Sequence, residues 1–305
     1  MKLIRSCLPA VFLFAISVPI CGAETTYYVA TNGNNSSNGL SWAAAVSNVE
    51  VAVQLANLST GIVVIGDGTF AITNADWILV TNAITIRSLN GPTYTALDAQ
   101  NVPLRRILYV NNALAMVSGL TLKRGSYSTW SGNNGPGALQ LMAGTVSNCI
   151  VTANTAYYYG GVLMAGGVLV DCVIHANTTD GSTGIGGGIG LSGGEVINCI
   201  ISNNVVSISG GGVTMSGGRM RDCQIMRNTP GTQFVPTDGG GVYMSGGTLE
   251  RCVIKNNTGA FPRGGGVYMS GGSLVNCLVL NNASLSWGGG IFMNNSTSRV
   301  IHTTV

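Results

Sequence analysis

The chain has 305 residues and a formal net charge of +3 at pH 7, and only 8% of its residues are charged against 46% hydrophobic ones. Charged residues usually make up about a quarter of a soluble domain, and no basic stripe is present, which argues against a nucleic-acid partner. With 45 glycines but only 8 prolines, the composition indicates a folded, repetitive chain and not a disordered one.

Residues 1–23 have the pattern of a secretion signal. Lys2 and Arg5 precede an apolar run, and Gly22 and Ala23 offer small residues for cleavage. The run is short for a membrane span, and no second apolar stretch follows it. We therefore predict a signal peptide over residues 1–23 and no transmembrane span. The mature protein is expected outside the cell or at the cell surface, including the outer membrane.

Residues 24–61 are predicted to form an N-terminal cap. Ser41 is a suitable N-cap for an amphipathic helix, whose buried face would carry Trp42, Val46, Val49, Val53 and Ala56. Such a helix would cover the open edge of the first coil, where unpaired strands invite association. Irregular first coils are predicted over residues 62–136, with strands at Ile62–Ile65, Ala83–Arg87 and Ile107–Val110.

Residues 137–305 contain a regular repeat. Six cysteines recur there, each is followed five residues later by an asparagine, and a glycine cluster precedes five of the six by 11 residues. The cysteines are Cys149, Cys172, Cys199, Cys223, Cys252 and Cys277, and the asparagines are Asn154, Asn177, Asn204, Asn228, Asn257 and Asn282. All length variation lies between the asparagine and the next glycine cluster, as expected for a solenoid that accepts insertions on one side.

One unit reads Gly-Gly-Val-x-Met-Ser-Gly-Gly-x-Leu-x-x-Cys-x-Ile-x-x-Asn. Apolar residues alternate with polar or small ones over short segments that glycine pairs interrupt, which predicts strands. One unit suits one coil, with successive coils about 4.8 Å apart. The predicted fold is all-β, a right-handed parallel β-helix with an N-terminal amphipathic capping helix. Val305 would fall in mid-coil, so we expect the natural protein to continue.

Two groups of motifs resemble those of known families. The run from Tyr27 to Gly33, then Trp42, then Gly66-Asp67-Gly68-Thr69-Phe70, is similar to the N-terminal module of secreted pectin-lyase-like β-helix proteins. The repeats resemble those of the polymorphic outer membrane proteins, although Ile254 and most of its counterparts replace the Phe of the Phe-x-x-Asn motif. The resemblance implies the fold and no single activity, since this fold hosts lyases, hydrolases, adhesins and inert stalks.

The six cysteines admit more than one interpretation. An even number in a secreted protein suggests disulfides. Stacked coils, however, would hold the side chains parallel and about 5 Å apart, whereas a disulfide needs about 3.5–4.5 Å between Cβ atoms and a specific torsion. We therefore predict a buried column of free thiols. Zinc is a remote alternative, because no histidine accompanies the cysteines.

The six asparagines are predicted to form a structural ladder where each coil turns. Asparagine tolerates left-handed backbone, and its amide can both donate and accept hydrogen bonds between coils. Binding of a ligand by these inward asparagines is not expected.

Charged residues at matched repeat positions have opposite signs. The predicted inter-coil ion pairs are Glu195–Arg219, Arg221–Glu250, Asp222–Arg251 and Asp238–Arg263. An exposed pair contributes less than about 1 kcal/mol, but like charges stacked in these positions would be unfavourable. We interpret the pairs as a device that sets the stacking register.

No catalytic residue, metal site or cofactor is predicted. A polysaccharide lyase needs carboxylates that hold calcium and a basic residue, and a glycosidase needs two carboxylates about 5–10 Å apart. After the four ion pairs, the repeats keep only Asp171 and Asp180 as acids. His175 is expected to be an exposed strand residue.

Aromatic residues gather in the variable loops, and they are the candidate ligand-binding residues: Tyr157, Tyr158, Tyr159, Phe234, Phe261 and Trp287. They could fold back and shield the coils, or they could stack on the apolar faces of sugars. In the second case the partner would be a polysaccharide or a host or cell-surface glycan.

Three functions follow, in order of preference. The first is a structural or adhesive protein without catalysis, the second is a carbohydrate-binding protein that uses the loop aromatics, and the third is a polysaccharide lyase or glycoside hydrolase of the pectin-lyase-like class.

Overall fold

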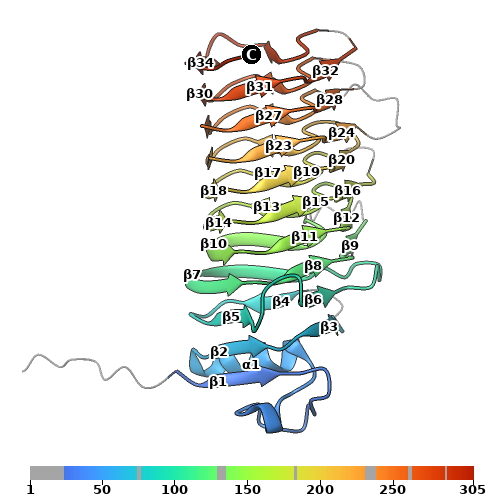
Figure 1. The fold of residues 1–305 in the computed structure, drawn as a ribbon, viewed down its shortest axis with the longest axis vertical. Coiled ribbons are helices and arrows are strands. Elements are labelled where there is room, and N and C mark those ends of the chain that lie inside the picture. Colours follow the sequence, from blue (N-terminus) through green and yellow to red (C-terminus); the bar gives the residue numbers. More distant parts are fainter. Residues whose placement is uncertain are drawn as a thin grey trace, which may run out of the picture.

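The computed structural model describes residues 24–73, 77–128, 135–181, 184–230, 238–259, 263–285 and 287–305. In these residues the chain winds into a right-handed parallel β-helix whose coils stack along one long axis (Figure 1). The predicted fold class is confirmed. The predicted signal peptide lies outside the described residues.

Short strands on successive coils form parallel sheets. The largest sheet within the described residues contains β1 (Thr26–Val29), β2 (Ile62–Ile65), β4 (Ile78–Val80), β5 (Thr85–Ser88), β7 (Leu108–Ser118), β10 (Leu139–Ser147), β13 (Val162–Met164), β14 (Val168–Val170), β17 (Ile189–Leu191), β18 (Glu195–Ile197), β21 (Val213–Met215), β22 (Arg219–Arg221), β25 (Val242–Met244), β26 (Thr248–Glu250), β29 (Val267–Met269), β30 (Ser273–Val275), β33 (Ile291–Met293) and β34 (Arg299–Ile301).

The other sheets lie on the remaining sides of the coil. The second sheet contains β3 (Gly68–Ala71), β6 (Thr95–Asp98), β8 (Thr121–Lys123), β11 (Ile150–Thr152), β15 (Val173–His175), β19 (Ile200–Ser202), β23 (Gln224–Met226), β27 (Val253–Lys255) and β31 (Leu278–Leu280). Two-residue strands form the third sheet and a separate pair: β9 (Ser126–Tyr127), β12 (Thr155–Ala156), β16 (Thr178–Thr179), β20 (Val205–Val206) and β24 (Thr229–Pro230), then β28 (Thr258–Gly259) with β32 (Ala283–Ser284).

The register aligns equivalent residues of successive repeats. Glu195 of β18 lies opposite Arg219 of β22, and Ile201 of β19 lies opposite Ile225 of β23. Because side chains alternate across a strand, each coil points the same apolar positions inward. All six repeat cysteines are buried in this core.

The cap differs from the prediction in where the helix begins. Ser41 caps only a 3-10 turn, Trp42–Ala44, whereas α1 spans Val49–Ser59 and its N-cap is Asn48. Between them Val46 pairs with Val29 as a β-bridge, so the chain is extended there. A helix that began at Ser41 would have given up this strand contact. The buried positions of α1 include Val49, Val53 and Ala56, as predicted, whereas Trp42, predicted on the same buried face, is 44% exposed.

The asparagine column is linked from coil to coil, and five of its six members are fully buried while Asn282 is half-buried. Nδ2 of Asn177 donates to Oδ1 of Asn204 at 3.0 Å, and the backbone N–H of Asn177 donates to the same oxygen at 3.0 Å. Nδ2 of Asn177 also donates to the carbonyl of Val151 at 3.0 Å. The left-handed residue of the turn is the one before the ladder asparagine, such as Ala176 at φ 53° or Asn203 at φ 53°. The prediction that placed the ladder asparagines themselves in that conformation is wrong.

The glycine clusters make room for this column. A Cβ atom at Gly212 would lie 2.7 Å from Nδ2 of Asn228 and 2.8 Å from the carbonyl oxygen of Gly241. The two repeated motifs are therefore coupled: the glycine backbone packs directly on the asparagine amide, and any side chain would displace it.

Candidate binding surface

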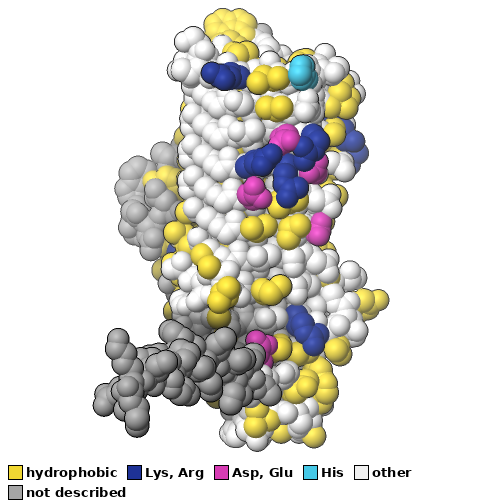
Figure 2. Space-filling model, turned by 90° about the vertical axis from the view of Figure 1, so that its left-hand side faces the viewer, with side chains coloured by type: hydrophobic (Ala, Val, Ile, Leu, Met, Phe, Trp, Pro, Cys, Tyr) yellow, Lys and Arg dark blue, Asp and Glu magenta, His cyan; other side chains and the backbone are white. Residues whose placement is uncertain are grey.

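Charged side chains gather in one cluster on the side of the solenoid that carries β18, β22 and β26 (Figure 2). We call this cluster the corner network; its members are Glu195, Arg219, Arg221, Asp222, Glu250 and Arg251. They come from three successive coils: Glu195 and Arg219 begin their strands, Arg221 and Glu250 end theirs, and Asp222 and Arg251 lie in the turns that follow.

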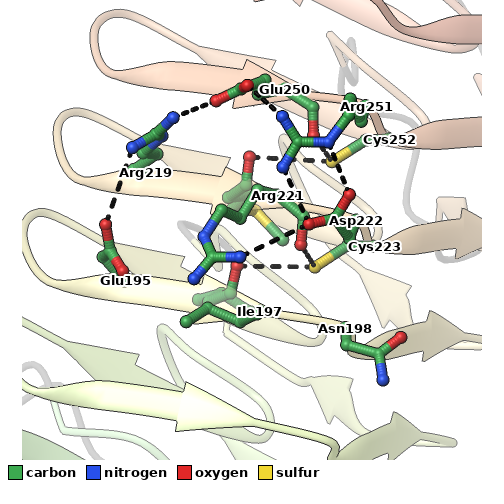
Figure 3. A network of polar contacts seen from close by, with 12 residues as sticks. Glu195, Ile197, Asn198, Arg219, Arg221, Asp222, Cys223, Glu250, Arg251 and Cys252 are labelled. Carbon is green, nitrogen blue, oxygen red and sulfur yellow. Dashed lines mark hydrogen bonds and ion pairs between the residues drawn. The ribbon is translucent and has the colours of Figure 1, made fainter.

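Arginines of the corner network lie between carboxylates of neighbouring coils (Figure 3). Arg219 approaches Glu195 at 3.9 Å on one side and pairs with Glu250 on the other. Arg251 holds Asp222 through two hydrogen bonds of 2.8 and 3.0 Å and also pairs with Glu250. The network therefore joins coils through alternating charges.

The prediction of an Arg221–Glu250 ion pair is wrong, although the two residues are register partners. Within the described residues, Arg221 instead contacts Asp222 of its own turn at 3.5 Å. The reason is competition, because Arg219 and Arg251 already take the two oxygens of Glu250.

The network favours the ionised form of two of its carboxylates, those of Asp222 and Glu250. Hydrogen bonding from Arg251 lowers the pKa of Asp222, and hydrogen bonding from Arg219 lowers the pKa of Glu250. A general acid at neutral pH needs the opposite shift. The electrostatics therefore suit ion pairs that hold neighbouring coils together at neutral pH.

Next to the network, a shallow corner groove of about 200 Å³ runs along the edge of β15, β19 and β23. Asp171, Asn198 and Asp222 form its polar side, and Val173 and Ile200 form its apolar side. Nδ2 of Asn198 donates to Asp171 at 2.7 Å. The groove thus offers amide and carboxylate groups beside aliphatic surface.

The cysteine column lies beneath this groove. All six cysteines are free and buried. The backbone N–H of Cys172 donates to Sγ of Cys199 at 3.4 Å, and that thiol donates to the carbonyl of Ile197 at 3.2 Å. Hydrogen bonding to Cys223 and burial raise the pKa of Cys252 to about 12. Each of the six side chains is at most 3% exposed, so these thiols pack as small residues of the core.

The remaining acids and His175 each have local partners. Asp180 accepts a hydrogen bond from Ser128, and Nδ1 of His175 lies 3.4 Å from Oγ1 of Thr152. His175 is half-buried, less open than predicted. No group of three or more His, Cys, Asp or Glu side chains that could hold a metal ion occurs in the part of the chain that the structure describes.

The three loop tyrosines fold back on the coils to different extents. The rings of Tyr157 and Tyr158 meet edge to face at 5.0 Å. The ring of Tyr159 lies on Gly190, where a Cβ atom would be 2.3 Å from it, and burial raises the pKa of its hydroxyl. Phe234 and Phe261 lie outside the described residues.

Trp287 belongs to an aromatic ladder that the sequence prediction missed. Rings at outward positions of β25, β29 and β33 stack at 5.1 Å (Tyr243–Tyr268) and 5.7 Å (Tyr268–Phe292), and Trp287 stacks on Phe292 at 6.3 Å. The sequence does carry a signal for this ladder, because the x position of the Gly-Gly-Val-x-Met motif is aromatic in the last three repeats. Stacked rings cover one another's faces, so within the ladder the open ring is that of Trp287, whose residue is 65% exposed.

The fourth predicted ion pair lies beside this ladder. Arg263 donates to both carboxylate oxygens of Asp238, at 3.1 and 2.8 Å. Its guanidinium also lies 5.2 Å from the ring centroid of Tyr268. The pair thus fixes the loop edge against the aromatic rings.

Within the described residues, none of the helices has the length and apolar character that a membrane crossing requires.

Comparison with known proteins identifies the fold. No curated protein matches the chain. A solved pectate lyase, Pel9A, aligns with 17% identity and a TM-score of 0.59 over 90% of this chain and 78% of its own. A rhamnogalacturonan lyase aligns with 15% identity and a TM-score of 0.57 over 92% of this chain and 87% of its own. At such identities the likeness concerns fold and not activity. Residues 137–305 match the family model described as the right-handed β-helix region, and the chain belongs to that family.

Proposed function

We propose that this protein is an extracellular structural or adhesive β-helix that acts by presenting a rigid surface, without catalysis. The observation that carries the proposal is the corner network. Its charged side chains pair with one another, and three of the five pairs join neighbouring coils. Such pairing supports a constant stacking register over the length of the solenoid.

The chemistry of the network also supports this role. A β-helix lyase would need carboxylates free to hold calcium and a basic residue free to take a proton. Here Arg219 and Arg251 each contact two carboxylates, and their hydrogen bonds lower the pKa of Glu250 and Asp222. These groups hold one another in place and offer a substrate little free charge.

The proposal is tested by separating adhesion from turnover. The secreted protein is incubated with pectin, alginate and glycosaminoglycans in the presence of calcium, and unsaturated products and new reducing ends are followed. We expect neither to accumulate, while immobilised protein retains cells or extracellular matrix. Steady product formation by the pure protein would refute the non-catalytic role.

Carbohydrate binding through the loop aromatics is a second candidate, favoured by the open ring of Trp287. If it is correct, Trp287→Ala and Tyr158→Ala reduce retention on a glycan array. Leu285→Ala is the matched control, because Leu285 lies in the same loop and is 81% exposed. Equal retention by all three variants and the wild type would remove this candidate.

A further inference from the structure

Several Asn-x-Ser/Thr motifs, the acceptor pattern for N-linked glycans, occur along the chain. Folded proteins carry such glycans at surface loops, because the attached sugar is bulky. Two of the motifs nevertheless begin with asparagines of the buried ladder: Asn177-Thr178-Thr179 and Asn282-Ala283-Ser284. The ladder positions therefore place a modification motif where the fold needs an unmodified amide.

The amide of Asn177, to which a glycan would be attached, has no room for one. Asn177 is fully buried. Both hydrogens of its Nδ2 are in use, because this nitrogen donates to the carbonyl of Val151 and to Oδ1 of Asn204, each at 3.0 Å. A single Cβ atom added at Gly161 would already lie 3.0 Å from the same nitrogen. An attached sugar would remove one of these hydrogen bonds and displace the neighbouring backbone.

The hydroxyl residue of this motif also lies inside the fold. Thr179 is 4% exposed, and its Oγ1 accepts a hydrogen bond from the backbone N–H of Ser207 at 2.8 Å. A glycosyl transferase recognises the asparagine together with this hydroxyl residue, and the folded coil offers it neither. Asn177 can therefore be modified only while the chain is unfolded.

Asn282 shows the same conflict at another position of the ladder. Its Nδ2 donates to the carbonyl of Ile254 at 2.9 Å, and its Oδ1 accepts from Nδ2 of Asn257 at 3.0 Å. The motif Asn256-Asn257-Thr258 differs, because Asn256 and Thr258 are both exposed. A glycan on Asn256 would extend into solvent. The conflict thus comes from the ladder position of the asparagine and not from the motif itself.

We propose that N-glycosylation of Asn177 and the native fold exclude each other, so this protein folds only where its unfolded chain meets no N-glycosyl transferase. In the modification, Nδ2 forms a bond to the first carbon of the glycan, and the bond from that carbon to the diphosphate of the lipid-linked donor breaks. One amide proton is released. The inference concerns folding, and it is independent of the adhesive role proposed above.

The test is export of the full chain from a eukaryotic cell that N-glycosylates proteins in its secretory pathway. We expect the wild type to be retained with a glycan on Asn177, and its secretion to be lost. Mass spectrometry after enzymatic removal of the glycan detects the modified position as aspartate. When an inhibitor of lipid-linked oligosaccharide synthesis blocks glycan transfer in the same cells, the wild type should be secreted in folded form.

Variants separate the effect of the glycan from the stability of the coil. Thr179→Val combined with Ser284→Ala removes both ladder motifs, and its secretion should exceed that of the wild type although the Thr179 hydrogen bond is lost. Thr179→Ser keeps the motif and the hydroxyl and should be retained. Thr258→Val is the matched control, because it removes an exposed motif and should leave secretion at the wild-type level.

Three results would overturn the inference. The first is a secreted, folded wild type that carries a glycan on Asn177. The second is a wild type that stays retained when glycan transfer is blocked. The third is a wild type that is secreted without this glycan as abundantly in untreated cells as in cells given the inhibitor.

Discussion

The regular repeats and the N-terminal coils both bury polar side chains, but they supply the hydrogen-bond partners of these side chains in different ways. In residues 137–305 each buried ladder asparagine finds a partner in its own counterpart one coil away, as Asn204 does with Asn228 at 3.0 Å. In residues 24–136 the buried polar groups have individual partners. Asp98 is held by Arg124 and by the backbone N–H of Gln100.

This difference shows what repetition contributes. In a repeated column, the same residue at each coil makes the same hydrogen bonds to the next coil. A shift in register would break these bonds along the whole column, so register errors are disfavoured. Unique contacts need a separate solution at each site. The following predictions test whether stability in the two regions rests on these different bonds.

The largest effect is expected from Asn204→Leu, which keeps approximately the side-chain size but removes the amide. Oδ1 of Asn204 accepts from the backbone and side chain of Asn177, and Nδ2 donates to the carbonyl of Ile174 at 3.0 Å. These buried groups lose their partner at a cost of about 1–3 kcal/mol each. The free energy of unfolding in urea should fall by about 3–6 kcal/mol. Asn111→Ala, at an exposed position, is the control, and an equal loss in both variants would contradict the ladder's role.

A smaller and pH-dependent effect is expected from Asp98→Asn. Burial opposes ionisation of Asp98, but hydrogen bonds from Arg124 and from the N–H of Gln100, with the charges of Arg124 and Lys123, lower its pKa overall. A folded-state pKa below the unfolded one stabilises the fold above the unfolded pKa, and this contribution is lost as pH falls through the folded pKa.

Asp98→Asn should therefore cost about 2 kcal/mol at neutral pH. The difference in melting temperature from the wild type should shrink as the pH falls below about 4, the ordinary pKa of an aspartate. A difference that stays constant over this range would show that the ion pair does not account for the loss. The Asn204→Leu difference provides the comparison, since an amide does not titrate.

The smallest effect is expected from Arg251→Gln in the corner network. Arg251 is 46% exposed at its side chain, and exposed ion pairs contribute less than about 1 kcal/mol. The thermal midpoint should fall slightly at low salt, and the difference should diminish as salt screens the network. A large, salt-independent loss would mean that the network does more than set register.

The sequence alone determined which residues stack, because a repeat at fixed spacing places the same residue type at the same position of every coil. The columns of Cys172 and Asn177 and the register of Glu195 with Arg219 follow from spacing alone. The fold followed from the same periodicity, and so did the inward direction of the apolar positions.

The tertiary structure decided everything that depends on competition between neighbours. Arg221 has Asp222 and not Glu250 as its partner because two other arginines occupy that carboxylate. The capping helix starts at Val49 because Val46 is used as a strand. The spacing of the repeats determines which residues are register partners on neighbouring coils. When a side chain has several possible partners within reach, the three-dimensional arrangement of several coils determines which one it contacts, and the sequence of a single repeat does not contain that information.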